Sequence, residues 1–296
     1  MKKLLPVLAL TLTAALASGV QAQTLDKIKK DGAITIGHRD ASIPFSYFDD
    51  KQQPVGYSMD ICMKIADAVK AELKLPNLKV NLNPVTSATR IPLMANGTID
   101  LECGSTTNNI ERQKQVAFAP TTFITANRLA AKKASNITKL DDLKGKAIVS
   151  TSGTTNIKQI TELNGSKNLG MNIMAGKDHA ESFLMMETGR AVAFAMDDIL
   201  LFSLIANSKT PADFIVASES LSVEPYGIMM RKDDPAFKKV VDAVANLMKS
   251  GELEKIYAKW FTSPIPPKGI NLNLPISPAL KKIFASPTDS GDPAKY

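Results

Sequence analysis

Cysteine and histidine are the scarcest reactive residues in this sequence, with two of each among 296 residues. Neither Cys62 nor Cys103 lies in a recognisable cysteine-hydrolase signature, so a catalytic cysteine is the least favoured interpretation. In an exported chain a disulfide between Cys62 and Cys103 is favoured, and two buried thiols are the alternative. The disulfide would close a loop of about 41 residues, which corresponds to about 4 kcal/mol in the chain-entropy treatment.

Blocks of one charge are also missing. The net charge is +7 for the whole chain and falls to +5 without Lys2 and Lys3. The lysines are scattered among acidic residues without interleaved aromatics, which is typical of a solvated surface and excludes a nucleic-acid-binding face. The turn at residues 152–155 lacks the lysine of a phosphate-binding loop, and no Gly-x-Ser-x-Gly motif occurs. Nucleotide binding is therefore not predicted, and neither a metal site nor a cofactor is expected.

Long apolar runs are missing after the N-terminal segment. Lys2 and Lys3 precede apolar residues 4–16 and a small-residue site at residues 20–22, which predicts a secretory signal peptide cleaved near Ala22. A membrane span needs about 20 apolar residues, and this run is shorter. The residue directly after the cleavage site is Gln23 and not a cysteine, so lipid attachment there is not predicted. We expect a soluble mature protein outside the cytoplasm, in the periplasm.

Arginine is scarce as well, because six of the 36 basic residues are arginine and thirty are lysine. Arg39 follows the apolar residues 33–37, and Arg90 follows a turn-like segment at residues 86–89. A guanidinium group is a planar fork that binds a carboxylate through two hydrogen bonds. Two such groups in one cleft would suit a ligand with two carboxylates. The spacing alone favours a different interpretation for Arg90, a surface arginine near the start of a helix.

Apolar runs alternate with amphipathic stretches along the chain, which predicts an α/β protein with a largely parallel sheet. The predicted strands are residues 33–37, 79–82, 99–102, 146–150, 171–175, 191–196 and 214–217. The predicted helices include residues 24–30, 61–73, 90–95, 182–188, 235–250 and 253–261, and another begins in the turn at residues 152–155. A proline-rich stretch at residues 263–267 then predicts a loosely structured tail.

A set of short motifs connects this pattern to a known family. Their order and spacing resemble those of the extracytoplasmic solute-binding proteins for polar amino acids, the ligand-capturing subunits of ABC importers. The resemblance spans residues 24–267 and is greatest to members that take glutamate and aspartate. The motifs include Gly37-His38-Arg39, Pro44-Phe45-Ser46-Tyr47, Arg90-Ile91-Pro92-Leu93, Glu102-Cys103-Gly104-Ser105-Thr106-Thr107, Thr151-Ser152-Gly153-Thr154-Thr155, Lys177-Asp178-His179 and Lys259-Trp260-Phe261.

The resemblance implies the two-lobe periplasmic binding protein fold, an α/β architecture with the ligand cleft between lobes that close by hinge motion. It implies crossing segments near residues 122–128 and 223–229. The expected organisation is a signal peptide (residues 1–22), the first part of lobe 1 (23–124), lobe 2 (125–224), the second part of lobe 1 (225–272) and a C-terminal tail (273–296).

The resemblance also assigns eight residues to the binding cleft. By analogy, Arg90 would hold the α-carboxylate of the ligand and Asp197 its α-ammonium group. Arg39 would meet the side-chain carboxylate with help from Ser87 and His179. The eight residues are Arg39, Ser87, Arg90, Ser105, Thr107, Thr155, His179 and Asp197.

Several of these residues and their neighbours also have purely structural interpretations. Thr155 could be an ordinary helix N-cap, with the nearby amides assisting an anion at the same time. Asp198 is a plausible N-cap next to Asp197, and the two could be confused. His179 alone would more often be a satisfied surface histidine. Met196 is expected to fill the core.

The expected function is capture of L-glutamate, L-aspartate or both by a monomer that delivers them to the membrane subunits of an ABC importer, without chemistry. Two alternatives remain. The first alternative is an enzyme on the same fold, because some dehydratases resemble solute-binding proteins. A sensor module that delivers its ligand to a receptor is the other. Glutamate and aspartate differ by one methylene, which usually supports only about 1–3 kcal/mol of discrimination.

Overall fold

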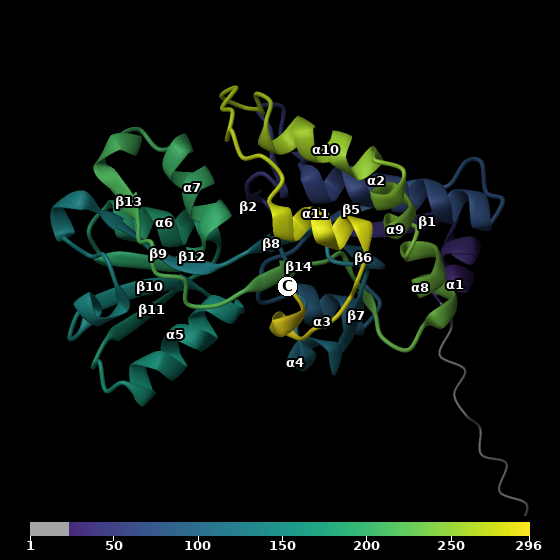
Figure 1. Cartoon of the computed structure of the whole chain (residues 1–296). Coiled ribbons are helices and arrows are strands. Elements are labelled where there is room, and N and C mark those ends of the chain that lie inside the picture. The colour runs from purple at the N-terminus through teal and green to yellow at the C-terminus, as the bar shows by residue number, and fades with distance from the viewer. Residues whose placement is uncertain (1–23) are drawn as a thin grey trace, which may run out of the picture.

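The computed structural model describes residues 24–296, so the predicted signal peptide lies outside the described residues. Two five-stranded sheets form the centres of two lobes that lie side by side (Figure 1). The predicted α/β class with two lobes is confirmed. In each sheet four strands run parallel and one runs antiparallel to them.

The sheet of lobe 1 has the strand order β5-β1-β6-β15-β7. Strand β1 lies between the parallel neighbours β5 and β6, so that Ile36 pairs with both Leu82 and Leu101. The five strands are β1 (Ala33–His38), β5 (Lys79–Pro84), β6 (Leu101–Glu102), β7 (Val116–Phe118) and β15 (Met229–Arg231). A small antiparallel sheet consists of β2 (Ala41–Ser42), β3 (Ser46–Phe48) and β4 (Pro54–Val55).

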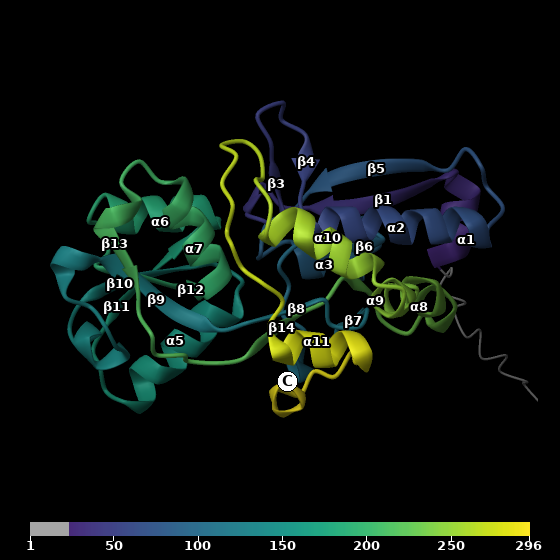
Figure 2. The ribbon, with the colours of Figure 1, turned by 45° about the horizontal axis from the view of Figure 1, so that its top comes forward.

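The long helix of lobe 1 is α2 (Tyr57–Glu72), whose apolar residues recur every four positions as predicted. Three later helices of the lobe pack on it. Figure 2 shows α2 and α10 lying along one side of the lobe. The remaining helices are α1 (Thr24–Asp31), α3 (Arg90–Ala95), α4 (Ile110–Gln113), α8 (Pro235–Val241), α9 (Val244–Lys249), α10 (Glu252–Phe261) and α11 (Pro278–Ala285).

The sheet of lobe 2 has the order β11-β10-β12-β9-β13. Its first three strands are parallel, and β9 is antiparallel to both of its neighbours. The strands are β9 (Asn127–Lys132), β10 (Ala147–Thr151), β11 (Asn172–Gly176), β12 (Ala193–Asp197) and β13 (Phe214–Val216). The helices are α5 (Thr155–Ser166), α6 (His179–Glu187) and α7 (Asp198–Asn207).

Two antiparallel strands, β8 (Phe123–Thr125) and β14 (Glu224–Tyr226), pair with each other between the lobes (Figure 1). Both lie inside the segments predicted to cross between the lobes. An aromatic cluster holds them to lobe 1, because the ring of Phe45 meets those of Phe123, Tyr226 and Phe261 edge to face at centroid distances of 5.0–5.7 Å. Such pairs favour one relative orientation of the rings. The crossing strands are therefore fixed at their lobe 1 end.

Two predictions about the C-terminal third are wrong. Residues 235–250 are not one helix, because Asp242 and Ala243 separate α8 from α9. Both helices contact α2, and in addition α8 packs on α1 while α9 packs on α10 and α11.

The tail after the proline-rich stretch is ordered rather than loosely structured. Helix α11 begins with Pro278, and the hydroxyl of Ser277 accepts a hydrogen bond from the amide of Leu280 at 3.1 Å. The side chains of Leu280 and Phe284 are buried in the main core. Further on, the amide of Thr121 donates to the carbonyl of Thr288 at 2.8 Å, so the tail returns to lobe 1.

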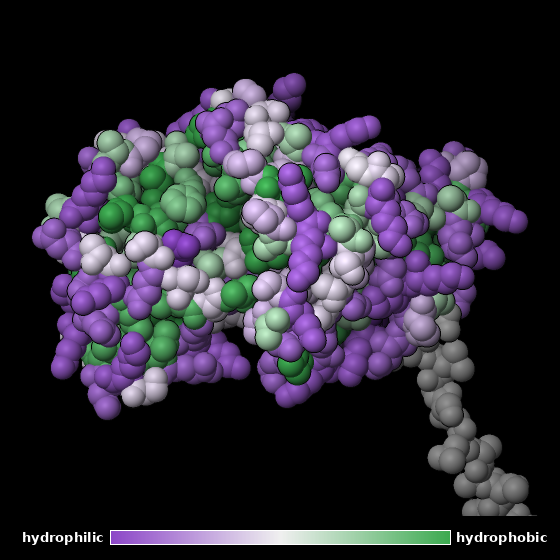
Figure 3. Space-filling view, in the orientation of Figure 1, coloured by the Kyte–Doolittle hydropathy of each residue, from purple (hydrophilic) through white to green (hydrophobic). Residues whose placement is uncertain are grey.

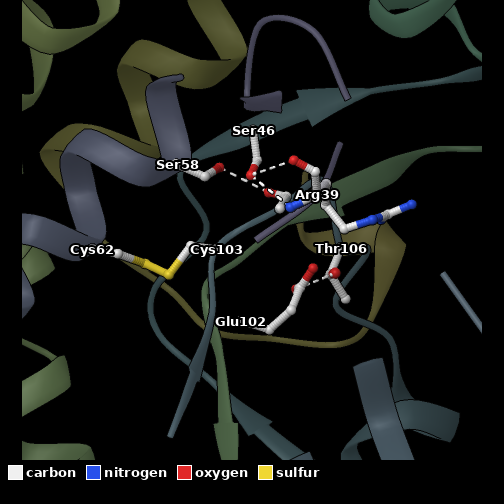
Figure 4. The surroundings of a disulfide bond; sticks show 8 residues. Arg39, Ser46, Ser58, Cys62, Glu102, Cys103 and Thr106 are labelled. Carbon is white, nitrogen blue, oxygen red and sulfur yellow. Dashed lines mark hydrogen bonds between the residues drawn. A yellow bond between two sulfur atoms is a disulfide. The ribbon is translucent and has the colours of Figure 1, made fainter. Parts of the chain in front are cut away.

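A disulfide joins Cys62 of α2 to Cys103, the residue after β6, as predicted (Figure 4). Both sulfurs are fully buried. The bond ties the long helix of lobe 1 to the strand end that leads into Gly104 and Ser105. It therefore fixes a loop that also carries residues of the predicted site.

Removing this disulfide should destabilise the protein by about 4 kcal/mol, because the reduced unfolded chain gains the entropy of an open loop of 41 residues. Urea unfolding with and without a thiol reductant measures the loss. A Cys62→Ser/Cys103→Ser variant is the control, since reductant should leave its midpoint unchanged. A midpoint of the unaltered protein that reductant does not move would contradict the prediction.

Candidate functional site

The predicted site residues follow the carboxyl ends of parallel strands in both sheets. In lobe 1, Arg39 follows β1, Ser87 and Arg90 follow β5, and Ser105 and Thr107 follow β6. In lobe 2, Thr155 follows β10, His179 follows β11 and Asp197 ends β12. Carboxyl ends of parallel strands meet at one edge of a sheet, where α/β proteins commonly bind ligands. Here the two edges face each other across the junction of the lobes.

A small cavity lies between these edges, and residues of both lobes line it. Lobe 1 contributes Ser87, Arg90, Ser105 and Thr107, and lobe 2 contributes Thr154, Thr155, Asn156, His179, Met196, Asp197 and Leu200.

Arg90 is the first residue of α3 and is buried with 2 % of its surface exposed. Its Nη1 donates to Thr106 Oγ1 at 2.5 Å and to the Ser105 carbonyl at 3.4 Å. Among residues 24–296 its Nε finds no hydrogen-bond partner. The alternative of a surface arginine is therefore wrong, and part of the guanidinium group is available to a ligand.

Glu102 lies behind the two cleft arginines and was not predicted as a site residue. Its Oε2 accepts a hydrogen bond from Thr106 Oγ1 at 2.5 Å (Figure 4). Its Oε1 lies 4.0 Å from Nη1 of Arg90. Burial lowers the pKa of Arg90, and the charge of Glu102 opposes that change. In the predicted strand at residues 99–102, acidic Asp100 and Glu102 alternate with apolar residues, and this pattern does not indicate which carboxylate faces the site.

Arg39 lies just outside the cavity, in a groove at the mouth of the cleft that His179 also lines. Its Nη2 donates to Ser87 Oγ at 2.6 Å, and its Nη1 has no hydrogen-bond partner within the described chain. Burial, with a further contribution from the charge of Arg90, lowers the pKa of Arg39 to about 10. The group therefore stays charged at neutral pH. It differs from the other seven predicted residues, which all line the cavity.

The turn after β10 supplies the lobe 2 side of the cavity. Thr154, not Thr155, is the N-cap of α5, because its hydroxyl accepts from the amide of Ile157 at 3.2 Å. The N-cap interpretation of Thr155 is therefore wrong. Its hydroxyl instead donates to Glu224 Oε2 on the crossing strand β14 at 2.8 Å.

His179 opens helix α6, three residues earlier than predicted, because the Asp178 carboxylate caps the helix through the amide of Glu181. The imidazole is buried, with Nδ1 3.0 Å from Thr151 Oγ1 and Nε2 unpartnered within residues 24–296. Burial and the nearby charges of Arg39 and Arg90 hold the pKa of His179 well below its usual value. His179 is therefore a neutral buried group, not a surface histidine.

Asp197 occupies the N-cap position of α7, but its carboxylate makes no capping hydrogen bond. Its Oδ2 accepts from the hydroxyl of Tyr226, and its Oδ1 accepts from Asn156 Nδ2 at 2.7 Å. Burial and the charge of Glu224 raise the pKa of Asp197 to about 7. The N-cap prediction for Asp198 is wrong, because Asp198 is the first helical residue and pairs with Arg128 at 3.2 Å.

A third buried arginine, Arg112, was also missed. Its Nη1 donates to the carbonyl of Thr107 at 2.8 Å, and its Nη2 donates to that of Gly153 at 3.4 Å. The sequence places Arg112 in a short charged segment that is typical of a surface, so no local pattern indicated its burial. Met196, predicted to fill the core, is buried there and also lines the cavity.

No group of three or more histidine, cysteine, aspartate or glutamate side chains within residues 24–296 could hold a metal ion. No helix in the same range is long and apolar enough to span a membrane. On the face in Figure 3, hydrophilic residues are spread over both lobes, in keeping with the predicted solvated surface.

Residues 34–263 match the family of bacterial extracellular solute-binding proteins, family 3. The match covers both lobes and all eight predicted site residues. The chain belongs to this family. Its known members are extracellular, which agrees with the expected location of this solute-binding protein outside the cytoplasm, while the predicted cleavage site near Ala22 lies outside the described residues.

Curated relatives resemble this solute-binding protein along nearly its whole length. The L-glutamate/L-aspartate-binding protein of Pseudomonas aeruginosa is 56% identical, with 96% of this chain and 94% of the relative covered. The glutamate/aspartate import solute-binding protein of Escherichia coli is 49% identical, with 96% of each chain covered. Both are named as binding proteins, which agrees with the expectation that the chain is not an enzyme.

Solved structures of proteins named for other ligands share the fold. A mutant of ArgBP from T. maritima has a TM-score of 0.71 at 26% identity, with 80% of this chain and 98% of that chain covered. The solute receptor for L-cysteine of Neisseria gonorrhoeae has a TM-score of 0.69 at 26% identity, with 80% and 92% covered. Since the same fold serves different amino acids, the side chains of the cleft must determine which one binds.

Asp197→Asn should stabilise the ligand-free protein most at high pH. The pKa of Asp197 is raised in the folded protein, so its protonated form stabilises the fold. This stabilisation is complete below the unfolded pKa near 4, and it is lost as the pH rises towards the folded pKa of about 7. Asparagine cannot ionise and avoids that loss. We expect a gain of roughly 1–4 kcal/mol at pH 8 that shrinks towards pH 4.5.

Urea unfolding of both proteins at pH 4.5, 6 and 8 measures this difference. Asp198→Asn is the matched control, because it removes the neighbouring carboxylate but leaves Arg128 without its partner. It should lose stability rather than gain it. A gain for Asp197→Asn that is the same at all three pH values would show that the carboxylate is not destabilised by burial.

Proposed function

We propose that this protein is the substrate-binding subunit of an ABC importer and captures L-glutamate and L-aspartate in the cavity between its lobes. The observation that carries the proposal is the distribution of buried charge around the cleft. Lobe 1 presents the guanidinium groups of Arg39 and Arg90, and lobe 2 presents the carboxylate of Asp197. The named ligands of the relatives that match nearly the full length support the same assignment.

An acidic amino acid carries two carboxylates and one ammonium group, the complement of these three side chains. We assign the α-carboxylate to Arg90, whose Nε is unpartnered within residues 24–296, with Ser105 and Thr107 beside it. The ammonium group is assigned to Asp197. Ionic hydrogen bonds of this kind are roughly twice as strong as neutral ones.

The side-chain carboxylate is assigned to Arg39, with Ser87 and His179 as neutral partners. Ser87 already accepts a hydrogen bond from Arg39, which fixes the guanidinium group towards the cavity wall that Ser87 lines. Because His179 is neutral, its Nε2 can accept from or donate to the ligand according to its tautomer. Thr155 is assigned to the lobe 2 side of the bound molecule.

The proposal includes both ligands because one methylene gives weak discrimination, about 1–3 kcal/mol. The partners are the importer's membrane subunits, and the protein acts as a monomer in the periplasm. Catalysis is not proposed. Although one structural neighbour is described as a precursor of cyclohexadienyl dehydratase, it is itself described as an amino acid-binding protein.

Calorimetric titration of the purified protein with glutamate, aspartate, glutamine and asparagine tests the function. We expect both acids to bind more tightly than their amides, since a neutral amide leaves Arg39 without a counter-charge. Incubation with each ligand followed by recovery of the unchanged amino acid checks that no turnover occurs. Equal affinities for the acids and the amides would contradict the assignment.

Arg39→Ala should weaken glutamate and aspartate by about a hundredfold or more while changing the affinity for glutamine much less. Loss of a buried charge-assisted pair costs roughly 2–5 kcal/mol, and only the acids form that pair. The ratio of glutamate to glutamine affinity is the decisive quantity. Arg190→Ala is the matched control, because it removes an exposed guanidinium group of lobe 2 and should leave both affinities unchanged.

A further inference from the structure

Gly153 makes an unusually close contact between the lobes. It lies in the turn before α5 with φ +76, in the left-handed region that favours glycine. A Cβ added there would lie 2.5 Å from Ala88 Cα, 2.6 Å from Ala88 N and 2.7 Å from Ser87 C. These are backbone atoms of lobe 1, so no flexible side chain could move aside. Only glycine allows the two chain segments to approach this closely.

Arg112 contacts the same residue from another element of lobe 1. Its guanidinium group donates to the Gly153 carbonyl and to the carbonyl of Thr107, so one planar group spans the two lobes. Both contacts adjoin the cavity, because Ser87 and Thr107 line it from lobe 1 and Thr154 lines it directly after Gly153. The elements that meet at Gly153 are therefore the same ones that surround the proposed ligand.

We propose that Gly153, held between the Ser87–Ala88 backbone and Arg112, is the latch that allows the cleft to close, and that Arg112 is a positioning residue of that latch. The inference rests on the proposed capture of a ligand by closure and adds the residues that determine how far the lobes close. It assigns no ligand contact to either residue. The latch acts on every ligand alike, whereas Arg39 is proposed to distinguish between ligands.

The crossing strands are the reason why a change in the latch would affect the closed state and not the open state. Strands β8 and β14 pair with each other in the segments that connect the lobes, and a hinge motion about these segments would leave that pairing in place. The contact of Gly153 with Ala88 exists only when the lobes are together. A methyl group at position 153 is therefore accommodated in an open molecule and excluded from a closed one. Affinity then falls by the factor by which the closed state is depopulated.

Gly153→Ala should weaken every amino acid that the protein binds by about ten- to hundredfold, the range expected when a methyl group is forced into a packed contact. Gly145→Ala is the matched control. Gly145 also belongs to lobe 2 and has φ +70, but an added Cβ there would have no neighbour within 4 Å. The two variants share the backbone cost of a left-handed alanine, so their unfolding midpoints should fall by similar amounts. Only Gly153→Ala should lose affinity.

Arg112→Lys tests the other half of the latch. Lysine keeps the positive charge but cannot present a planar fork to two carbonyls. We expect a smaller loss of affinity that is equal for glutamate, aspartate and their amides, with faster ligand dissociation in stopped-flow measurements. A change in the ratio of acid to amide affinity would overturn this part of the proposal, because it would mean that Arg112 contacts the ligand carboxylate.

The affinity measurements begin with a thermal-shift screen of the unaltered protein against the twenty amino acids, and the latch is tested on whichever binds best. A best ligand that is not acidic contradicts the proposed function but leaves the test of the latch intact. Small-angle scattering at saturating ligand should give a larger radius of gyration for Gly153→Ala than for Gly145→Ala. Equal radii together with equal affinities would overturn the latch.

Discussion

Three guanidinium groups are buried in one cleft, and keeping these charges out of water constrains the structure around them. Arg39, Arg90 and Arg112 each expose less than a tenth of their surface. An unpaired buried charge costs several kcal/mol, so each group needs opposite charge or fixed dipoles nearby. Buried Glu102 lies behind Arg90, and carbonyl oxygens receive Arg112. On the far side of the cavity, Asp197 and Glu224 are carboxylates that repel each other and have their own donors in Tyr226 and Thr155.

The fold meets this requirement because strand ends, which carry many free polar groups, face each other from two sheets. Of the eight parallel strands, four in each sheet, six carry the predicted site residues at or after their carboxyl ends, which face the junction of the lobes. The crossing strand β14 adds Glu224 and Tyr226, so the hinge itself contributes hydrogen bonds to the site. A hinge movement at β14 therefore displaces the partners of Thr155 and Asp197. In this arrangement the electrostatics of the cleft and the angle between the lobes cannot change independently of each other.

Local periodicity in the sequence predicted the α/β class and the strands, and the family resemblance predicted the two lobes. The disulfide was predicted because the chain has two cysteines and was expected to be exported. The sequence did not predict the buried Glu102, Glu224 and Arg112, since burial of a charge depends on partners distant in the chain. The assignment of helix caps failed for the same reason. Thr154 and Thr155 are equivalent by composition, and only the position of Glu224 distinguishes their roles. The ordered tail was missed because the proline-rich stretch before α11 obscured the apolar positions Leu280, Ile283 and Phe284.

The unpartnered polar atoms around the cleft explain why closure would depend on a ligand. Within the described residues these atoms include Nη1 of Arg39, Nε of Arg90 and Oγ of Ser105 in lobe 1, and Nε2 of His179 in lobe 2. Each buried group without a partner costs about 1–3 kcal/mol, and more where the group is charged. In an open cleft, water would satisfy all of them. Closing without a ligand therefore carries a penalty shared by both lobes. Three of these four atoms, including those of both charged groups, belong to lobe 1, so a molecule that binds the two arginines removes most of this penalty. A ligand that also reaches His179 removes the rest, and closing then becomes favourable.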